Sequence, residues 1–91
     1  MAKIHVVKRA YEADVVAAKV VDAAEADILV FLDPGGARAI GDTLWSYAGK
    51  FQATTKLFWA GREDPNALKV FFVEEASQAK WMKDHVLRGQ L

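Results

Sequence analysis

The chain has 91 residues, which is enough for one domain and too few for two. Its 12 basic and 12 acidic residues balance, which argues against a general nucleic-acid binder or a membrane-surface protein. There is no cysteine, so disulfides and thiolate metal sites are excluded. No apolar run approaches the roughly 20 residues of a membrane span, and the start of the chain does not have the pattern of a signal peptide. We therefore expect a cytoplasmic domain without membrane contact.

A polar residue followed by alanine recurs along the chain every 12 to 14 residues. The two identical copies are Glu12-Ala13-Asp14 and Glu25-Ala26-Asp27. Spacing close to 13 residues predicts repeated strand-and-turn units. We interpret the alanine as a small residue that lets each connection lie close to the sheet. The repeat alanines are Ala13, Ala26, Ala39, Ala53, Ala67 and Ala79.

Short runs of β-branched, aromatic and other apolar residues predict six strands. The run at 28–32 is apolar at every position, which is typical of a strand buried on both faces. A seventh short element, Trp81-Met82, should dock on the core. The predicted strands are residues 4–7, 15–21, 28–32, 44–47, 56–59 and 68–73.

The connections at 8–14, 22–27 and 74–80 contain good helix formers but are too short for a stable helix, so each predicts a single helical turn. Asp22 is expected to cap the second turn, with Glu25 completing a capping-box pair. The strongest turn signal, Asp33-Pro34-Gly35-Gly36, replaces a helical turn in the third connection.

Together these elements predict one mainly β domain with an α+β fringe, spanning 1–91, with a repeat core at 3–82 and a short helical or frayed tail at 83–91. Connections this short normally join antiparallel hairpins, because parallel neighbours need about a dozen residues to cross over. The strands are therefore expected to be mixed in direction, with any parallel pairing between strands that are not consecutive.

The ordered motifs of the chain resemble the septoil-knot domains, small proteins catalogued as a domain of unknown function. The motifs are V-V-x-x-x-x-E-A-D-V, V-V-D-x-x-E-A-D-I, G-D-x-L-W, K-V-F-F-V and S-Q-A-K-W, and they cover Lys3 to about Trp81. The resemblance implies a monomeric, very stable, β-rich domain whose backbone is threaded into a deep seven-crossing torus knot. It brings no agreed catalytic residues. The chain departs from the usual pattern at Ala17-Ala18, inside the second strand, and at the Asp33-Pro34-Gly35-Gly36 turn.

Gly41, Asp42 and Trp45 form the least repeat-like segment and are the first candidate for a ligand site. A carboxylate beside an indole can bind a cationic or aromatic ligand. The alternative, which we favour, is that Asp42 anchors a connection while Trp45 fills the core.

Lys56, Trp59 and Arg62 interleave cations with an aromatic ring, as binders of single-stranded nucleic acid do. The balanced net charge and the position of Trp59 inside a predicted strand favour core packing instead.

The remaining polar residues give no catalytic pattern, and no metal or cofactor site is predicted. His5 and His85 lie at opposite ends of the chain without a carboxylate at ligand spacing. Asp14 and Asp27 occupy the same repeat position, which favours a structural role in satisfying backbone N–H groups at strand starts.

The favoured interpretation is thus a non-catalytic, highly stable structural or interaction domain that is monomeric and contacts a protein partner through an exposed connection. A small-molecule binder or enzyme near Gly41–Trp45 and a single-stranded nucleic-acid binder are the alternatives.

Overall fold

The computed structural model describes residues 2–33 and 41–91. The predicted turn residues Pro34, Gly35 and Gly36 and the repeat alanine Ala39 lie outside the described residues. Three 3-10 turns accompany the strands: η1 (Ala10–Glu12), η2 (Ala23–Glu25) and η3 (Ala76–Gln78). The strands are β1 (Ala2–Val6), β2 (Val15–Lys19), β3 (Ile28–Leu32), β4 (Leu44–Tyr47), β5 (Thr55–Trp59), β6 (Leu68–Val73) and β7 (Lys80–Trp81).

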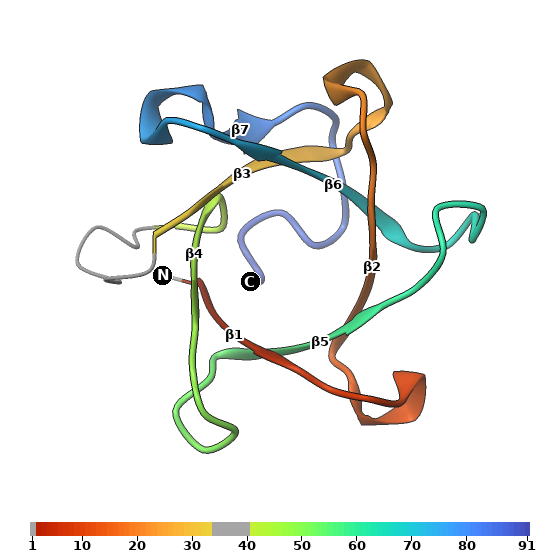
Figure 1. The fold of residues 1–91 in the computed structure, drawn as a ribbon, viewed down its shortest axis with the longest axis vertical. Helices are drawn as coiled ribbons and strands as arrows, with labels where there is room; N and C mark the ends of the chain where they lie inside the picture. The colour runs from red at the N-terminus through yellow and green to blue at the C-terminus, as the bar shows by residue number, and fades with distance from the viewer. Residues whose placement is uncertain (1, 34–40) are drawn as a thin grey trace.

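Six of the strands close into a barrel, in the order β4-β1-β5-β2-β6-β3, with β3 pairing back to β4. All six pairings around the barrel are parallel. The short β7 adds to β3 in the antiparallel direction. Figure 1 looks down the barrel, with the strands crossing one another around a central axis and the turns projecting outward. The expectation of a mainly β domain with short helical connections is confirmed.

The chain passes around the barrel twice. On the first lap, β1, β2 and β3 take alternate positions, and on the second lap β4, β5 and β6 fill the places between them. Adding 13 to each residue number converts the register Ile4↔Thr55 into Ala17↔Leu68, so the sequence repeat is also a structural repeat. The two laps are interleaved strand by strand.

Short connections do not make hairpins here. Between the two laps, parallel pairing joins strands that are far apart in sequence, as the sequence predicts. The exception is β3 and β4, which are consecutive and parallel, and their connection spans residues 33–43. That length is close to the dozen residues that a parallel crossover needs. Among the strands that the structure describes, only β7 runs antiparallel to its neighbour.

Alternate residues of the barrel strands point inward and fill the interior, as expected for a small barrel. The two tryptophans of the interior each lie beside an alanine on the neighbouring strand, in the registers Ala2↔Trp45 and Ala17↔Trp59. Ala17 therefore does not interrupt β2; it leaves room for the indole of Trp59. The buried core consists of Ala2, Ile4, Val15, Ala17, Ile28, Val30, Trp45, Leu57, Leu68 and Val70.

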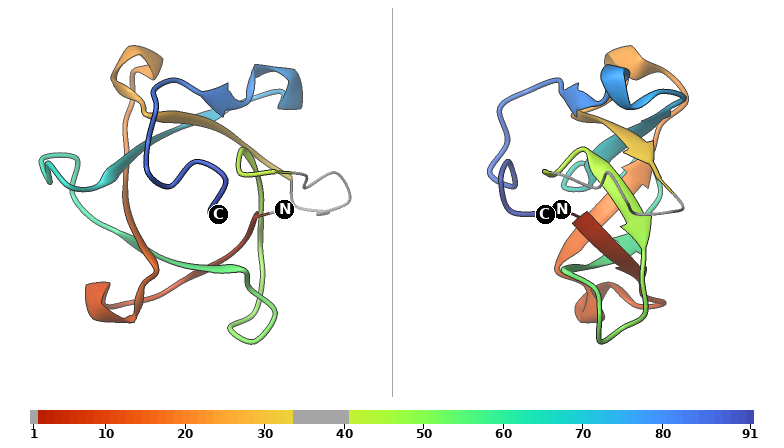
Figure 2. Two further views of the ribbon diagram at one scale, coloured as in Figure 1. Left: turned by 180° about the vertical axis from the view of Figure 1, so that it is seen from behind. Right: turned by 90° about the vertical axis from the view of Figure 1, so that its left-hand side faces the viewer.

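The C-terminal segment after β7 crosses one end of the barrel. Figure 1 shows it curling over the centre, and the side view in Figure 2 shows it on one face, with its end near the start of β1. Leu87 and Leu91 pack against the barrel core, so this segment covers the open end of the interior. Residues 86–89 form turns rather than the short helix expected from the sequence. The last residue, Leu91, is half-buried.

No helix in the part of the chain that the structure describes is long and apolar enough to cross a membrane.

Candidate functional site

Asp42, the polar residue of the first candidate site, receives hydrogen bonds from the C-terminal segment. The indole Nε1 of Trp81 donates to Oδ2 at 3.2 Å, and the backbone N–H of Leu91 donates to Oδ1 at 3.1 Å. The backbone N–H of Gly89 also donates to Oδ2. We call this arrangement of Asp42, Trp81, Gly89 and Leu91 the carboxylate latch, because it ties the last residues of the chain to the start of the second lap.

Gly41 precedes the latch in a left-handed conformation, with φ of +75°. This backbone conformation is strained for residues that carry a Cβ, which explains a glycine immediately before Asp42. Gly89 has a similar φ of +83° on the opposite side of the latch.

Trp45 is fully buried inside the barrel, with 0% of its surface exposed. Its ring packs against Trp59 and Phe72, with centroids 6.4 Å and 6.1 Å away. Its Nε1 donates to the backbone oxygen of Asp42 at 2.6 Å. Asp42 and Trp45 are therefore in contact, but they form an anchor and a core residue rather than an open carboxylate–indole surface.

The structure does not bring Lys56, Trp59 and Arg62 together. Trp59 packs against the core inside the barrel, where the ammonium of Lys19 lies 4.9 Å from its ring centroid. Lys56 is three positions earlier on β5, so it points to the other face of the sheet. Arg62 is exposed in the connection that follows β5.

Asp14 and Asp27 have the structural role predicted from the repeat. The N–H of Asp27 donates to the oxygen of Lys69 at 2.8 Å, and the N–H of Lys69 donates to Oδ2 of Asp27 at 2.9 Å. Asp14 and Lys56 make the same pair of bonds at 2.8 Å and 2.9 Å. Each carboxylate extends the ladder between a first-lap strand and a second-lap strand.

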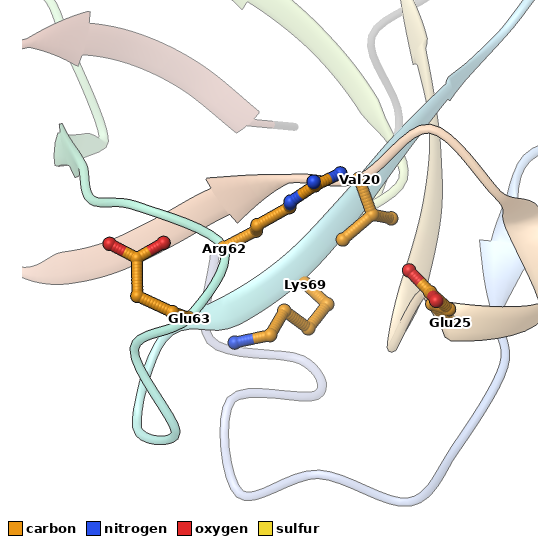
Figure 3. A pocket seen from close by; sticks show the side chains of 5 residues that line it. All are labelled: Val20, Glu25, Arg62, Glu63 and Lys69. Carbon is orange, nitrogen blue, oxygen red and sulfur yellow. The ribbon is translucent and has the colours of Figure 1, made fainter.

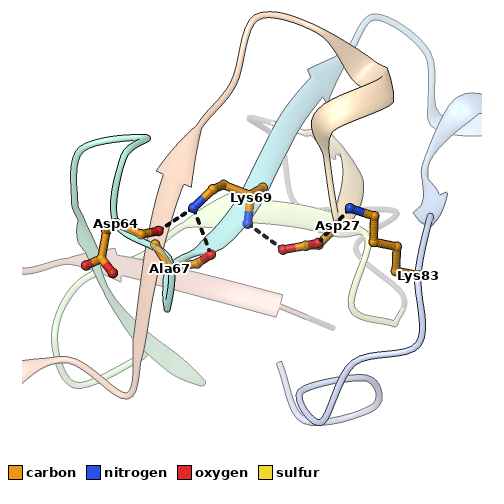
Figure 4. A network of polar contacts seen from close by, with 5 residues as sticks. All are labelled: Asp27, Asp64, Ala67, Lys69 and Lys83. Carbon is orange, nitrogen blue, oxygen red and sulfur yellow. Dashed lines mark hydrogen bonds and ion pairs between the residues drawn. The ribbon is translucent and has the colours of Figure 1, made fainter.

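The pair at Asp27 belongs to a larger polar network, drawn in Figure 4. Nζ of Lys83, from the C-terminal segment, lies 3.6 Å from Oδ1 of Asp27. Nζ of Lys69 donates to the backbone oxygens of Asp64 and Ala67, at 2.5 Å and 3.4 Å. The network joins the residue before β3, the connection before β6 and the tail.

The repeat alanines close the outward turns. Each of the five in the described part of the chain has an N–H that donates to a backbone oxygen three or four residues earlier. Only two of their side chains are buried, Ala26 at 0% and Ala67 at 5% exposed, so the close-packing interpretation applies most directly to them. The five are Ala13, Ala26, Ala53, Ala67 and Ala79.

The cap predicted at Asp22 is confirmed, since Oδ1 accepts from the N–H of Ala24 at 2.9 Å. The capping box expected with Glu25 instead occurs at the third turn, where the side chain of Gln78 accepts from the N–H of Glu75 at 3.2 Å.

The two histidines lie in separate parts of the fold. His5, at the end of β1, has Nδ1 3.1 Å from the backbone oxygen of Ala48. His85 stacks on Trp81 with centroids 5.9 Å apart, and its Nδ1 accepts from the N–H of Leu87. Within residues 2–33 and 41–91, no group of three or more His, Asp or Glu side chains is placed to hold a metal ion.

Sequence reasoning selected Asp42 but missed its partners. The latch joins residues 47 and 49 positions apart, and no local pattern links Gly89 or Leu91 to Asp42. The only signal in the sequence is a pair of glycines: Gly41, which precedes Asp42, and Gly89, which belongs to the latch.

Comparison with known families identifies one match, to the 7(1) septoil knot domain over residues 1–82. No curated protein and no solved structure matches the chain. Because the match covers most of the chain, the protein belongs to the septoil knot domain family.

Proposed function

We propose that this septoil knot domain is a non-catalytic, highly stable structural or interaction domain with a knotted backbone. One observation carries the proposal: the carboxylate of Asp42, the best polar candidate for a ligand site, accepts three N–H groups from the domain's own C-terminal segment. A carboxylate bound in this way holds the C-terminal segment against the barrel. Trp45, three residues further along the chain, is fully buried in the core.

Two features support a knot. The family is described as a 7(1) septoil knot, and the described residues form seven strand pairings. In the view down the barrel, paired strands cross one another, as Figure 1 illustrates for β1 with β4 and with β5. A chain that winds twice around an axis with interleaved laps has the geometry of a torus knot.

Mechanical unfolding tests the knot. The protein is held by its two ends in optical tweezers and pulled until it unfolds. A chain without a knot extends by about 3.3–3.6 Å for every residue. A knotted chain stops short of that length, because the residues in the tightened knot cannot be extended. Release of the full contour length of all 91 residues would contradict the proposal.

The structural role of Asp42 is tested with Asp42→Ala. Hydrogen bonds to a charged acceptor contribute about 1.5–3 kcal/mol each, and water replaces part of this at a half-buried position, so we expect a loss of about 2–4 kcal/mol in the free energy of unfolding. Faster amide exchange at Gly89 and Leu91 should accompany it. Asp42→Asn keeps one acceptor oxygen and should lose less.

The ligand-site alternative makes a different prediction for the same segment. Amide NMR shifts confined to residues 41–45 on titration with pooled metabolites, abolished by Asp42→Asn in a variant that stays folded, would favour a small-molecule site over a purely structural one. Unchanged spectra with every pool support the structural role.

The proposal includes a monomer that works in the cytoplasm and contacts a protein partner through an exposed connection. Phe51, in the connection between β4 and β5, is 97% exposed and supports such a contact. Sedimentation of the purified protein at several concentrations tests the monomer, and a mass that rises with concentration would count against it.

A further inference from the structure

Two hollows lie one repeat unit apart on the surface of the barrel. The basic hollow has a volume of about 430 Å³ and is lined by His5, Val6, Val7, Lys8, Arg9, Glu12 and Lys50. The neutral hollow, drawn in Figure 3, has a volume of about 530 Å³ and is lined by Val20, Glu25, Arg62, Glu63 and Lys69. Three lining positions match with a shift of 13 residues: Val7 with Val20, Glu12 with Glu25, and Lys50 with Glu63.

The hollows differ in charge. The basic hollow has three cationic side chains, Lys8, Arg9 and Lys50, against the single carboxylate of Glu12, a net charge of +2 with His5 neutral. The neutral hollow sets two cations against two carboxylates. Since the whole chain is balanced at 12 basic and 12 acidic residues, the excess at the basic hollow is a local feature.

The cations of the basic hollow are free to bind a ligand. Among the residues that the structure describes, no carboxylate or carbonyl oxygen bonds the ammonium of Lys8 or Lys50. Arg9 donates one N–H to the hydroxyl of Tyr11 at 2.9 Å, which orients its guanidinium and leaves the other donors available. By contrast, Lys69 of the neutral hollow already donates to two backbone oxygens.

His5 adds a second kind of group to the basic hollow. Its Nδ1 faces the backbone oxygen of Ala48 at 3.1 Å, and a carbonyl can only accept, so Nδ1 carries the proton. Val6 and Val7 give the same hollow an apolar part, and Val6 is 40% exposed.

We propose that the basic hollow binds a phosphate ester of a small organic molecule. A guanidinium and two ammonium groups bind the phosphate oxygens through charge-assisted hydrogen bonds, and the valines contact the organic group. The volume of the hollow lies within the roughly 300–1,000 Å³ usual for small-ligand sites.

The test is an amide NMR titration of the full chain with phenyl phosphate at low ionic strength. Saturable shifts are expected at Lys8, Arg9 and Lys50, with affinity that falls as salt is added. Lys50→Glu gives the basic hollow the residue found at the matched position 63, and we expect it to weaken binding about tenfold. Lys80→Glu makes the same change in net charge at an exposed site on β7 and should leave affinity unchanged.

Three outcomes would overturn the proposal: no saturable shift at the basic hollow, shifts spread over exposed lysines in general, or equal weakening by Lys50→Glu and Lys80→Glu.

Inorganic phosphate forms the second arm of the titration. Binding of phenyl phosphate several-fold tighter than inorganic phosphate is expected from the contact with Val6 and Val7. Equal affinities would overturn the assignment to an ester and leave a plain anion site.

Discussion

The basic hollow and the neutral hollow share a backbone frame and differ in the side chains that surround it. Val7 and Val20 donate to Leu57 and Val70 at 2.8 Å and 2.9 Å, and Asp14 and Asp27 make matching bonds to Lys56 and Lys69. Around this common frame, Lys8-Arg9 corresponds to Val21-Asp22, and Lys50 to Glu63. Positions that hold the two laps together are thus repeated, whereas exposed positions of the same unit are free to diverge in charge.

The two aspartates of the backbone frame are not equally buried. The largest difference between the hollows is therefore expected in the stability lost when each aspartate is replaced. Asp27 has a part-buried bond to Lys69 and an ion pair with Lys83, while Asp14 is exposed. Asp27→Ala should lower the free energy of unfolding by about 2–3 kcal/mol and Asp14→Ala by about 1 kcal/mol. Urea unfolding, approached from both the folded and the unfolded state, measures both. Equal losses would show that the two units are energetically equivalent.

Replacing the repeat alanines should reveal a smaller difference in stability between the two units. Ala26 is fully buried among Val20 and Leu29, whereas Ala13 is half-buried. Ala26→Leu is expected to cost about 1–3 kcal/mol through overpacking, and Ala13→Leu less than about 1 kcal/mol. For a domain of this size, 1 kcal/mol corresponds to a change of about 4–8 °C in Tm, which circular dichroism resolves. A tolerated Ala26→Leu would remove the packing explanation of the repeat alanine.

The smallest effect is expected from moving charge between the hollows. Glu63→Lys gives the neutral hollow the residue of the matched position in the basic hollow, so its affinity for phenyl phosphate should rise about threefold at low salt. Stability should change by less than about 0.5 kcal/mol, because Glu63 is exposed. If binding does not rise, then charge alone does not distinguish the hollows, and the geometry of Arg9 and His5 becomes the more important factor.

The strands themselves were largely predictable from local sequence. The runs at Ile28–Leu32, Leu44–Tyr47 and Leu68–Val73 match the observed strands at both ends, since hydrophobic runs with β-branched and aromatic residues specify strands directly. The second strand was predicted to continue to Val21 but ends at Lys19, where the chain leaves the sheet toward η2.

The arrangement of those strands could not be predicted in the same way. Register partners such as Val15 and Leu57 belong to different laps, and nothing near either residue specifies the other. The carboxylate latch and the basic hollow were missed for the same reason, since Lys50 approaches Lys8 and Arg9 only once the second lap lies beside the first. The 13-residue repeat could have indicated the basic hollow, because the sequence alone shows that matched positions of the repeat differ in charge.

The interleaving of the laps also governs how the protein is made. None of β1, β2 and β3 pairs with another of the three, so these strands leave the ribosome without a partner. The hydrogen bonds between Asp27 and Lys69 join residues 42 positions apart. At a synthesis rate of about 5–20 residues per second, Asp27 waits roughly 2–8 s for Lys69. During that time the apolar run Ile28–Leu32 is open to chaperones and to other nascent chains.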